Sequence, residues 1–247
     1  MTSQYNAPAQ AGKTVIITGI TGGIGSALAQ KFASEGFNIG GSYFSNTEAA
    51  AALKVKLEKF NVSAEIYKCD ISNHSEVRDF ISKFSSISCL INNAGITAPA
   101  LTLKMAESDF TNVLDVNVNG AFFVTKESAK IMTRQKHGSI INISSILSAS
   151  SPAGAANYSA SKAALNSLTK TFSRELGRFN ITVNAVFPGF HNTAMGSAVS
   201  EKYIESIKNE SVLGKTTDIN ELVNFVYFLS GLKTVSGQIF NIDSRIV

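Results

Sequence analysis

The sequence predicts an α/β fold, in which a doubly wound parallel sheet of about seven strands lies between two layers of helices. Three observations lead to this three-layer sandwich. Short apolar runs rich in β-branched residues alternate along the 247-residue chain with segments of helical periodicity. Most of these runs are apolar at consecutive positions, as strands covered on both faces must be. Regular alternation is typical of βαβ units, whose crossover helices cover both faces of one sheet.

Each element follows from its own segment of sequence. The expected strands are residues 14–19, 37–44, 63–69, 88–95, 138–145, 181–189 and 237–243. Helical periodicity marks residues 48–60, 76–84 and 221–229. Asp218 and Glu221 have the spacing of a capping pair at the last of these helices. Because no repeat or linker divides the chain, we expect one domain at 13–247, preceded by a polar tail at 1–12.

The composition excludes several classes of function. The 22 basic and 18 acidic residues are dispersed, so a net charge of +4 does not indicate a nucleic-acid groove. No apolar run has the length of a membrane span, and the first eleven residues lack a signal-peptide pattern. The spacing of Cys69 and Cys89 matches no metal site, and free thiols suit a reducing compartment. We therefore expect a cytoplasmic protein without a metal, a nucleic-acid partner or a membrane anchor.

A glycine-rich turn follows the first expected strand. Gly19, Gly23 and Gly25 lie in the stretch TGITGGIGSALAQ, which runs directly into an amphipathic helix. Glycine permits a tight turn and lets the backbone approach a pyrophosphate, whose charge then lies at the helix N-terminus. In this strand–turn–helix context the pattern predicts a Rossmann-type dinucleotide site that includes Thr21 and Gly22.

The end of the second expected strand bears on which dinucleotide binds. An acidic residue here would bind the 2′-hydroxyl of NAD, but the chain has Tyr43 and Phe44, and Glu48 already belongs to the next helix. Without a carboxylate there is no repulsion against a 2′-phosphate. Hydroxyl and amide donors follow at Ser42, Ser45, Asn46 and Thr47. NADP(H) is the preferred cofactor, and NAD(H) stays open.

A lysine occurs on the apolar face of another expected helix. Leu165, Phe172 and Leu176 recur at helical spacing, and Tyr158 and Lys162 fall on the same side. A buried ammonium is costly unless a strongly polar group meets it. This helix therefore predicts a functional partner for Lys162.

A further polar residue interrupts an apolar helical stripe. Phe110, Leu114, Ala121 and Val124 form the stripe, and Asn117 lies in its middle. Two interpretations remain open from the residues alone. Asn117 is either a core asparagine with its hydrogen bonds satisfied or a functional group.

Taken together, these motifs resemble those of the short-chain dehydrogenase/reductase family. The similarity extends over residues 13–237, nearly the whole chain. The motifs occur in the family's order: TGITGGIG at 18–25, CDIS at 69–72, NNAG at 92–95, NISS at 142–145, YSASK at 158–162 and PGFHNTAM at 188–195. Within the family, NNAGIT, HGSIINISS and ITVNAVFPGF look most like the 3-oxoacyl-[acyl-carrier-protein] reductases.

The resemblance implies four catalytic residues. Tyr158 would be the general acid that protonates the carbonyl oxygen as hydride arrives. Lys162 would hold the nicotinamide ribose and lower the pKa of the tyrosine. Ser145 would hydrogen-bond the substrate oxygen, and Asn117 would hold a water in a proton relay to Lys162.

The resemblance also implies a set of cofactor-binding residues. Asp70 would meet the adenine amino group, with the backbone of Ile71 beside it. The remaining expected contacts, in addition to the glycine turn with Ile24 and to Tyr43, Phe44 and Ser45, come from Asn92, Ala94, Gly95, Pro188, Gly189 and Thr193.

The expected reaction is NADPH-dependent reduction of a carrier-linked 3-oxoacyl thioester to the 3-hydroxyacyl thioester, in fatty acid or polyketide-type synthesis. The alternatives are a short-chain dehydrogenase for another alcohol or carbonyl compound and a non-catalytic dinucleotide-binding regulator or assembly partner. The set Asn117, Ser145, Tyr158 and Lys162 favours an enzyme, because binding alone would not need it.

Several expectations about partners follow from the resemblance. Lys136 and Arg178 would lie beside the active-site mouth and meet an acidic carrier protein. Residues 197–211 form an amphipathic segment expected to be a substrate lid. The family assembles as tetramers, here on the helices that bear Asn117 and Tyr158, although a dimer stays open. The family's tail has two glycines where this chain has Ser244 and Arg245, and NADP-preferring members often have arginine where it has Gly22.

Overall fold

The computed structural model describes residues 12–191 and 200–246 of the chain. These residues form a seven-stranded sheet in the order β3-β2-β1-β4-β5-β6-β7, with every pair parallel. The strands are β1 (Thr14–Thr18), β2 (Asn38–Tyr43), β3 (Ala64–Lys68), β4 (Cys89–Asn92), β5 (Gly138–Ile143), β6 (Ile181–Phe187) and β7 (Ile239–Asn241). The predicted parallel sheet is confirmed.

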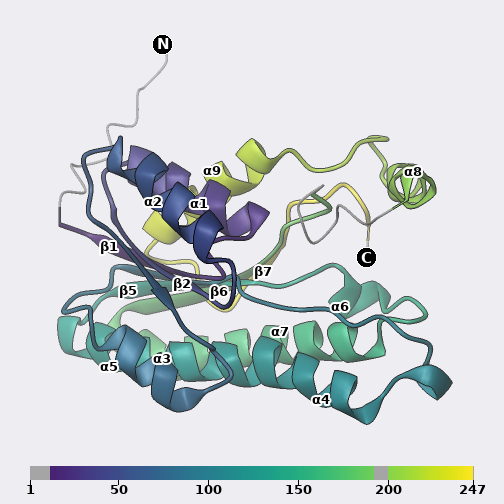
Figure 1. Cartoon of the computed structure of the whole chain (residues 1–247), viewed down its shortest axis with the longest axis horizontal. Helices are drawn as coiled ribbons and strands as arrows, with labels where there is room; N and C mark the ends of the chain where they lie inside the picture. Colours follow the sequence, from purple (N-terminus) through teal and green to yellow (C-terminus); the bar gives the residue numbers. More distant parts are fainter. Residues whose placement is uncertain (1–11, 192–199, 247) are drawn as a thin grey trace.

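Helices cover both faces of the sheet. They are α1 (Gly23–Ser34), α2 (Thr47–Glu58), α3 (His74–Ile81), α4 (Glu107–Leu114), α5 (Ala121–Gln135), α6 (Leu147–Ser150), α7 (Ala156–Leu176), α8 (Glu201–Glu210) and α9 (Ile219–Gly231), with the shorter turns η1 (Thr102–Lys104), η2 (Asp115–Gly120) and η3 (Gly177–Phe179). Figure 1 shows α1, α2 and α9 on one face and α3, α4, α5 and α7 on the other. This is the predicted three-layer sandwich.

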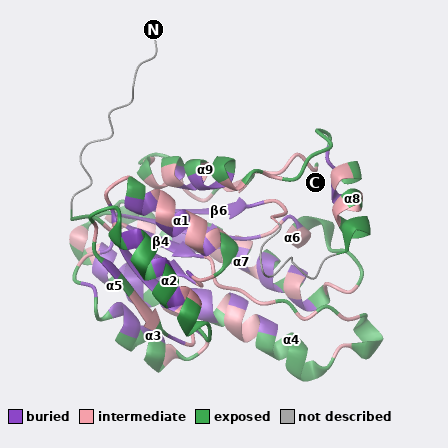
Figure 2. Cartoon of the chain, turned by 45° about the horizontal axis from the view of Figure 1, so that its top comes forward, coloured by how far each residue is buried: buried purple, intermediate pink, exposed green. Residues whose placement is uncertain are grey.

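Two apolar cores lie on the two faces of the sheet. Successive residues of β1 alternate between them: Val15 and Ile17 pack against the α1–α9 layer, and Ile16 packs against the α3–α5 layer. Burying each such side chain stabilises the fold by about 1.5–3 kcal/mol. Figure 2 shows buried residues concentrated in the sheet and on the inner sides of the helices. The consecutive apolar positions of the sequence therefore mark a sheet that is covered on both faces.

The strand order reverses direction at the neighbours β1 and β4. The chain first builds outward from β1 through β2 to β3, then returns to β4 and builds outward on the other side. In doubly wound sheets, the crevice beyond the carboxyl ends of the strands at such a reversal binds ligands. The turns after β1 and β4 therefore mark the expected position of a functional site.

Helix ends differ from the sequence prediction by a few residues because polar side chains cap the first turns. Asn46 accepts a hydrogen bond from the amide of Ala49, and Asn73 accepts from Ser75, so α2 and α3 begin earlier than expected. At α9 the carboxylate of Asp218 accepts from the amide of Asn220, which confirms the Asp218 cap. The last strand is shorter than predicted, with only three residues.

The expected continuous helix around Asn117 is interrupted. A π-helix of six residues, η2, separates α4 from α5. On α4, Phe110 is 39% exposed while Val113 is buried. The expected apolar stripe is therefore not buried along its whole length. π-helical turns often occur at functional sites, and this one contains Asn117.

Two further observations concern the described residues. No helix within 12–191 and 200–246 is long and apolar enough to span a membrane. The predicted amphipathic segment 197–211 contains α8, capped by Ser200, whose hydroxyl accepts from the amide of Tyr203. Residues 197–199 lie outside the described part of the chain.

Candidate active site

A cavity of about 640 Å³ lies at the carboxyl edge of the sheet, where the turns after β1 to β6 and the start of α7 meet. This volume is in the range of about 300–1,000 Å³ that is usual for small-molecule sites. The predicted residues that line it are Gly19, Thr21, Gly22, Gly23, Ile24, Tyr43, Phe44, Ser45, Asp70, Ile71, Ala94, Gly95, Tyr158, Lys162 and Pro188. The structure therefore brings both predicted motifs, the glycine turn and the Tyr158–Lys162 pair, into one cavity.

The glycine turn is packed too tightly for side chains. Gly19 has φ +62°, and a Cβ there would lie 2.8 Å from the Cα of Ala94. A Cβ on Gly25 would meet the carbonyl oxygen of Gly19 and lie 2.9 Å from Nδ2 of Asn93. The turn after β1 therefore lies directly against the turn after β4. The first turn of α1 has no acidic residue, so its free amides present a positive end to the cavity.

Replacing Gly25 by alanine is expected to weaken dinucleotide binding by about tenfold or more, because overpacking costs about 1–3 kcal/mol and 1.4 kcal/mol is tenfold in affinity. Fluorescence titration with NADPH measures the change. Gly231→Ala is the matched control, since a Cβ there has nothing within 4 Å. A folded Gly25→Ala protein with unchanged affinity would show that this close packing does not shape the site.

The two asparagines after β4 have different environments. Asn92 is buried, and its amide nitrogen donates to Oγ1 of Thr125 at 2.9 Å and to Oδ1 of Asn142 at 2.8 Å. Its side chain therefore points into the core and does not line the cavity, contrary to our expectation. Asn93 lines the cavity instead, and its Nδ2 donates to the carbonyls of Thr18 and Gly19 at 3.0 and 3.1 Å. Strand alternation, applied from Leu90, would have identified Asn93.

The far end of the cavity is polar. Oδ1 of Asp70 accepts from the amide and the hydroxyl of Ser72, at 2.9 and 2.7 Å. Ser42 is 1% exposed, lines the cavity and has no hydrogen-bond partner for its hydroxyl among the described residues. Ser42 and Asn46, which we expected as donors, line the cavity, and the lining residues that the sequence prediction missed are Cys69, Ser72, Asn93, Ile96, Asn112, Val116, Ile143 and Ser144. Most of them neighbour a predicted residue in a turn.

Lys162 is the buried cation of the site. It is 3% exposed, and its ammonium donates to the carbonyl of Ile143 at 2.8 Å. The ammonium also lies 5.6 Å from the centroid of the Tyr158 ring. Burial lowers the pKa of Lys162 from 10.5 to about 8. The polar partner that the buried lysine required is therefore a strand-end carbonyl together with an aromatic face.

The pKa of Tyr158 departs from our expectation. Burial raises the pKa of the phenol, and a hydrogen bond with Ser145 acts in the opposite direction. The net shift is upward, because burial outweighs the effects that favour the phenolate. The lowering by Lys162, whose ammonium lies 5.6 Å from the ring centroid, stays a prediction. A raised pKa keeps the proton on Tyr158 at neutral pH, as a proton donor requires.

Asn117 is buried and does not itself line the cavity. It is 1% exposed, its Oδ1 accepts from the amide of Ile96 at 2.8 Å, and its Nδ2 donates to the carbonyl of Ile96 and to Oγ of Ser161, both at 2.9 Å. A Cβ on Gly95 would lie 3.1 Å from Oδ1 of Asn117 and 3.4 Å from Nζ of Lys162. The side chain thus fixes the turn after β4 against α7, and its role in a water relay stays a prediction.

The remaining predicted residues lie around the same edge. Ser145 follows β5, and its hydroxyl accepts from the amide of Leu147 at 3.2 Å besides its bond with Tyr158. Gly189 has φ +77°, and a Cβ there would collide with Thr217. Thr193 lies outside the described residues.

Lys136 and Arg178 lie at the other edge of the sheet. Lys136 ends α5 immediately before β5, and Arg178 lies in η3 immediately before β6, over the ring of Phe179. Residues that lead into parallel strands are a full strand length away from the cavity at the strands' carboxyl ends. The prediction that these two residues lie beside the active-site mouth of their own chain is therefore wrong.

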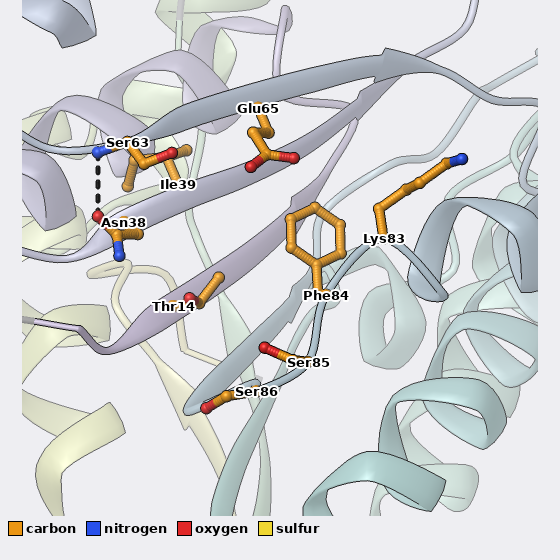
Figure 3. A pocket seen from close by; sticks show the side chains of 9 residues that line it. All are labelled: Thr14, Asn38, Ile39, Ser63, Glu65, Lys83, Phe84, Ser85 and Ser86. Atoms are coloured by element: carbon orange, nitrogen blue, oxygen red, sulfur yellow. Dashed lines mark hydrogen bonds between the residues drawn. The ribbon is translucent and has the colours of Figure 1, made fainter.

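A second, smaller cavity of about 130 Å³ also lies at this opposite edge, around the starts of β1 to β3 (Figure 3). Asn38 closes one side by accepting a hydrogen bond from the amide of Ser63 at 2.9 Å. The cavity is too small for a dinucleotide. Within the described residues, no group of three or more His, Cys, Asp or Glu side chains is placed to hold a metal ion.

Comparisons with known proteins agree with this geometry. The family model described as short chain dehydrogenase matches residues 13–204. Similar curated proteins include the 3-oxoacyl-[acyl-carrier-protein] reductase FabG of Staphylococcus aureus strain Mu50, 34% identical over 94% of this chain and 96% of that protein. FabG of Rickettsia felis is 39% identical over 94% and 95%.

Solved structures give the same result. A variant of an actinorhodin polyketide ketoreductase, solved with NADPH, has a TM-score of 0.88 and 28% identity, covering 96% of this chain and 98% of that one. A double mutant of a Serratia marcescens short-chain dehydrogenase/reductase has a TM-score of 0.89 and 30% identity, with the same coverage. The chain belongs to the short-chain dehydrogenase/reductase family and is an NAD(P)-dependent oxidoreductase.

Proposed function

We propose that the chain reduces a 3-oxoacyl thioester linked to acyl carrier protein to the 3-hydroxyacyl thioester, with NADPH as the reductant, in fatty acid or polyketide-type synthesis. The observation that carries this proposal is that Tyr158, which is hydrogen-bonded with Ser145, lines one cavity together with Lys162 and the glycine turn. The similarity to 3-oxoacyl-[acyl-carrier-protein] reductases and to a polyketide ketoreductase supports the choice of substrate.

The residues present fit a dinucleotide. Gly19 and Gly25 leave a cradle that a Cβ would fill, and the N-terminus of α1 offers amides for a pyrophosphate. The unpartnered hydroxyl of Ser42 is available for the ribose end. When bound, the cofactor supplies a hydride to the carbonyl carbon. Asp70, Ala94 and Pro188 would hold its two ends along the cavity.

The chain's own side chains would supply the proton. Tyr158 gives its phenolic proton to the carbonyl oxygen, which becomes the hydroxyl of the product. Ser145 donates to the same oxygen and so orients it toward Tyr158. Lys162 stabilises the phenolate that forms, because a nearby cation favours the charged form. Asn117 would contribute indirectly, because its hydrogen bond with Ile96 holds the turn that carries Gly95 in place.

The preference for NADPH follows from the wall around the adenosine ribose. Tyr43, Phe44 and Ser45 line this wall without a carboxylate that would repel a 2′-phosphate. Ser42 and Ser45 offer hydroxyl donors to it. The solved ketoreductase with NADPH supports the same choice.

We also propose an even-numbered assembly, a homotetramer, built on α4, α5 and α7. Phe110 and Phe122 are 39% and 38% exposed on this layer, and Phe122 lies 6.1 Å from the ring of Phe172 on α7. Exposed aromatic side chains are enriched at interfaces. A mass in solution of a single chain would contradict this assembly.

We also propose the cytoplasm as the location. Cys69 and Cys89 are both buried free thiols, and free thiols persist in a reducing compartment.

The decisive experiment measures oxidation of NADPH, and separately NADH, with acetoacetyl-acyl carrier protein, acetoacetyl-coenzyme A and a panel of simple ketones and alcohols. We expect the highest kcat/KM for the carrier-linked thioester with NADPH. Preference for another carbonyl compound would replace the substrate while keeping the enzyme class. Dinucleotide binding without any turnover would contradict the enzymatic proposal.

A further inference from the structure

The C-terminal residues that depart from the family pattern form a set of contacts with the residues directly after α8. Nε of Arg245 donates to Oδ2 of Asp243 at 2.8 Å, and the backbone amide of Arg245 donates to Oδ1 at 3.0 Å. The two side chains are only 10% and 4% exposed. A buried ion pair with this hydrogen bonding holds the tail in one conformation. We call Asp243, Ser244 and Arg245 the tail clasp.

The tail clasp holds the end of α8. The hydroxyls of Ser244 and Ser211 are hydrogen-bonded, and the amide of Val212 donates to the carbonyl of Ser244 at 3.2 Å. Ser211 and Arg245 also form an antiparallel bridge. Ser211 is the residue directly after α8, so these contacts fix the helix at its carboxyl end.

The same tail supports the turn after β6. The carbonyl of Ile242 accepts from Oγ1 of Thr217 at 3.2 Å, and Thr217 in turn lies against Gly189. Two residues after Gly189, Nε2 of His191 donates to the carbonyl of Pro188 at 2.7 Å, and Pro188 lines the cavity. Asp243 is close enough to His191 to raise its pKa, although burial lowers it more.

α8 and this turn are also in direct contact. The rings of Phe190 and Tyr203 meet edge to face with centroids 6.1 Å apart. Figures 1 and 2 both place α8 at the end of the molecule where α6 lies. The contacts therefore run from the tail, through α8 and the turn after β6, to the wall of the cavity.

We propose that Asp243, Ser244 and Arg245 are positioning residues of this enzyme, which fix α8 and the turn after β6 as the substrate-side wall of the active site. The inference rests on the proposed function, because it assigns these elements to the side that receives the carbonyl substrate. Two glycines in place of Ser244 and Arg245 could make neither the hydroxyl pair nor the ion pair. The tail thus gives this chain its own means of shaping the substrate site.

Kinetics of Ser244→Ala and Arg245→Ala test the proposal. A substitution far from the reacting atoms that displaces the wall of an active site can lower the reaction rate by up to about 100-fold. We therefore expect kcat/KM for the carbonyl substrate to fall about tenfold. NADPH affinity, measured by fluorescence titration, should fall less than kcat/KM, because only Pro188 of the loosened elements faces the cofactor, and Arg245→Lys should restore most of the loss. Lys208→Ala is the control, because it removes a surface ion pair of α8 and touches no tail residue.

Hydrogen exchange provides a readout that does not depend on the substrate. Amides of residues 201–215 and 187–191 should exchange faster in Ser244→Ala and Arg245→Ala, while those of the glycine turn keep their wild-type rates. Faster exchange with unchanged kcat/KM would make the tail merely structural and overturn the proposal. So would a parallel loss of NADPH affinity. If the wild-type protein reduces no thioester, the proposed function fails, but the exchange measurement still tests the role of the tail clasp. Unchanged exchange at 201–215 in the variants would contradict that role.

Discussion

The Tyr158→Phe protein is expected to reduce its carbonyl substrate about 10²- to 10⁴-fold more slowly than the wild type, since general acid catalysis contributes a factor of this size. The change removes one hydroxyl and leaves the ring, whose centroid is 5.6 Å from the ammonium of Lys162. The ring contact and the cavity wall are therefore kept. NADPH affinity should remain that of the wild type.

Steady-state NADPH oxidation and a fluorescence titration measure the two quantities on the same preparation. Tyr203→Phe is the matched control, because it removes a phenolic hydroxyl from an exposed position on α8 and keeps the ring contact with Phe190. Retention of most of the activity in Tyr158→Phe would remove the phenol from the reaction. Loss of NADPH binding together with activity would instead point to a damaged cavity.

The sheet was predictable because its signal is local. Strands such as β5 and β6 are buried at every position, so their sequences are mostly apolar, and their few polar side chains, such as Asn142 and Asn184, are hydrogen-bonded in the core. The π-helix η2 was not predictable in this way, because its extra residue per turn depends on the contacts of Asn117 with Ile96 and Ser161. The short β7 and the exposed Phe110 depend likewise on what packs beside them.

Site residues were predictable from the sequence where a motif determines the backbone conformation. They were less predictable where the role of a residue depends on which way its side chain points. The glycine turn requires glycine for a positive φ at Gly19 and a close approach at Gly25, so sequence and geometry coincide. Asn92 and Asn93 are neighbours in one motif, but strand alternation sends one to the core and one to the cavity.

Other site residues depend on which edge of the sheet a segment reaches. Ser42 was expected only as one of several hydrogen-bond donors after the second strand. In the structure it lines the cavity, and its hydroxyl has no hydrogen-bond partner among the described residues. Lys136 and Arg178 were assigned from the resemblance alone. Their positions before β5 and β6 place them at the edge opposite the cavity.

Replacing Lys162 is the second change for which we expect a large effect. The effect concerns kcat/KM and its dependence on pH. Burial lowers the pKa of its ammonium from 10.5 to about 8. Below about pH 8 the folded chain holds a charged amine beside Tyr158, and above it the amine becomes neutral. We therefore expect kcat/KM for reduction to fall as pH rises through about 8. Lys162→Met should be about 10²- to 10³-fold slower at neutral pH, the cost of removing one electrostatic group, and lack this inflection.

The same shift predicts the pH dependence of stability. Between about pH 8 and 10.5 the amine is neutral in the folded chain but still protonated in the unfolded one. At this group the unfolded state then binds more protons, so Lys162 contributes a rise in the free energy of unfolding over this window, of about 3 kcal/mol in total. Burial raises the pKa of the Cys69 and Cys89 thiols to about 12, which acts in the opposite direction. Below pH 8 Lys162 is protonated in both states and its burial cost is present in full.

Urea unfolding at pH 7 and pH 9.5 measures the pH dependence of the whole chain, and the difference between wild type and Lys162→Met isolates the contribution of Lys162. Lys162→Met leaves the carbonyl of Ile143 without its donor, which costs about 1–3 kcal/mol at either pH, so only the pH-dependent contribution of Lys162 should disappear. Lys208→Met, an exposed lysine of α8, should keep the wild-type dependence. Equal pH dependence in wild type and Lys162→Met would mean that the amine stays charged when buried. The Ile143 carbonyl and the Tyr158 ring would then suffice to hold a full ammonium, and the inflection in activity near pH 8 would belong to another group.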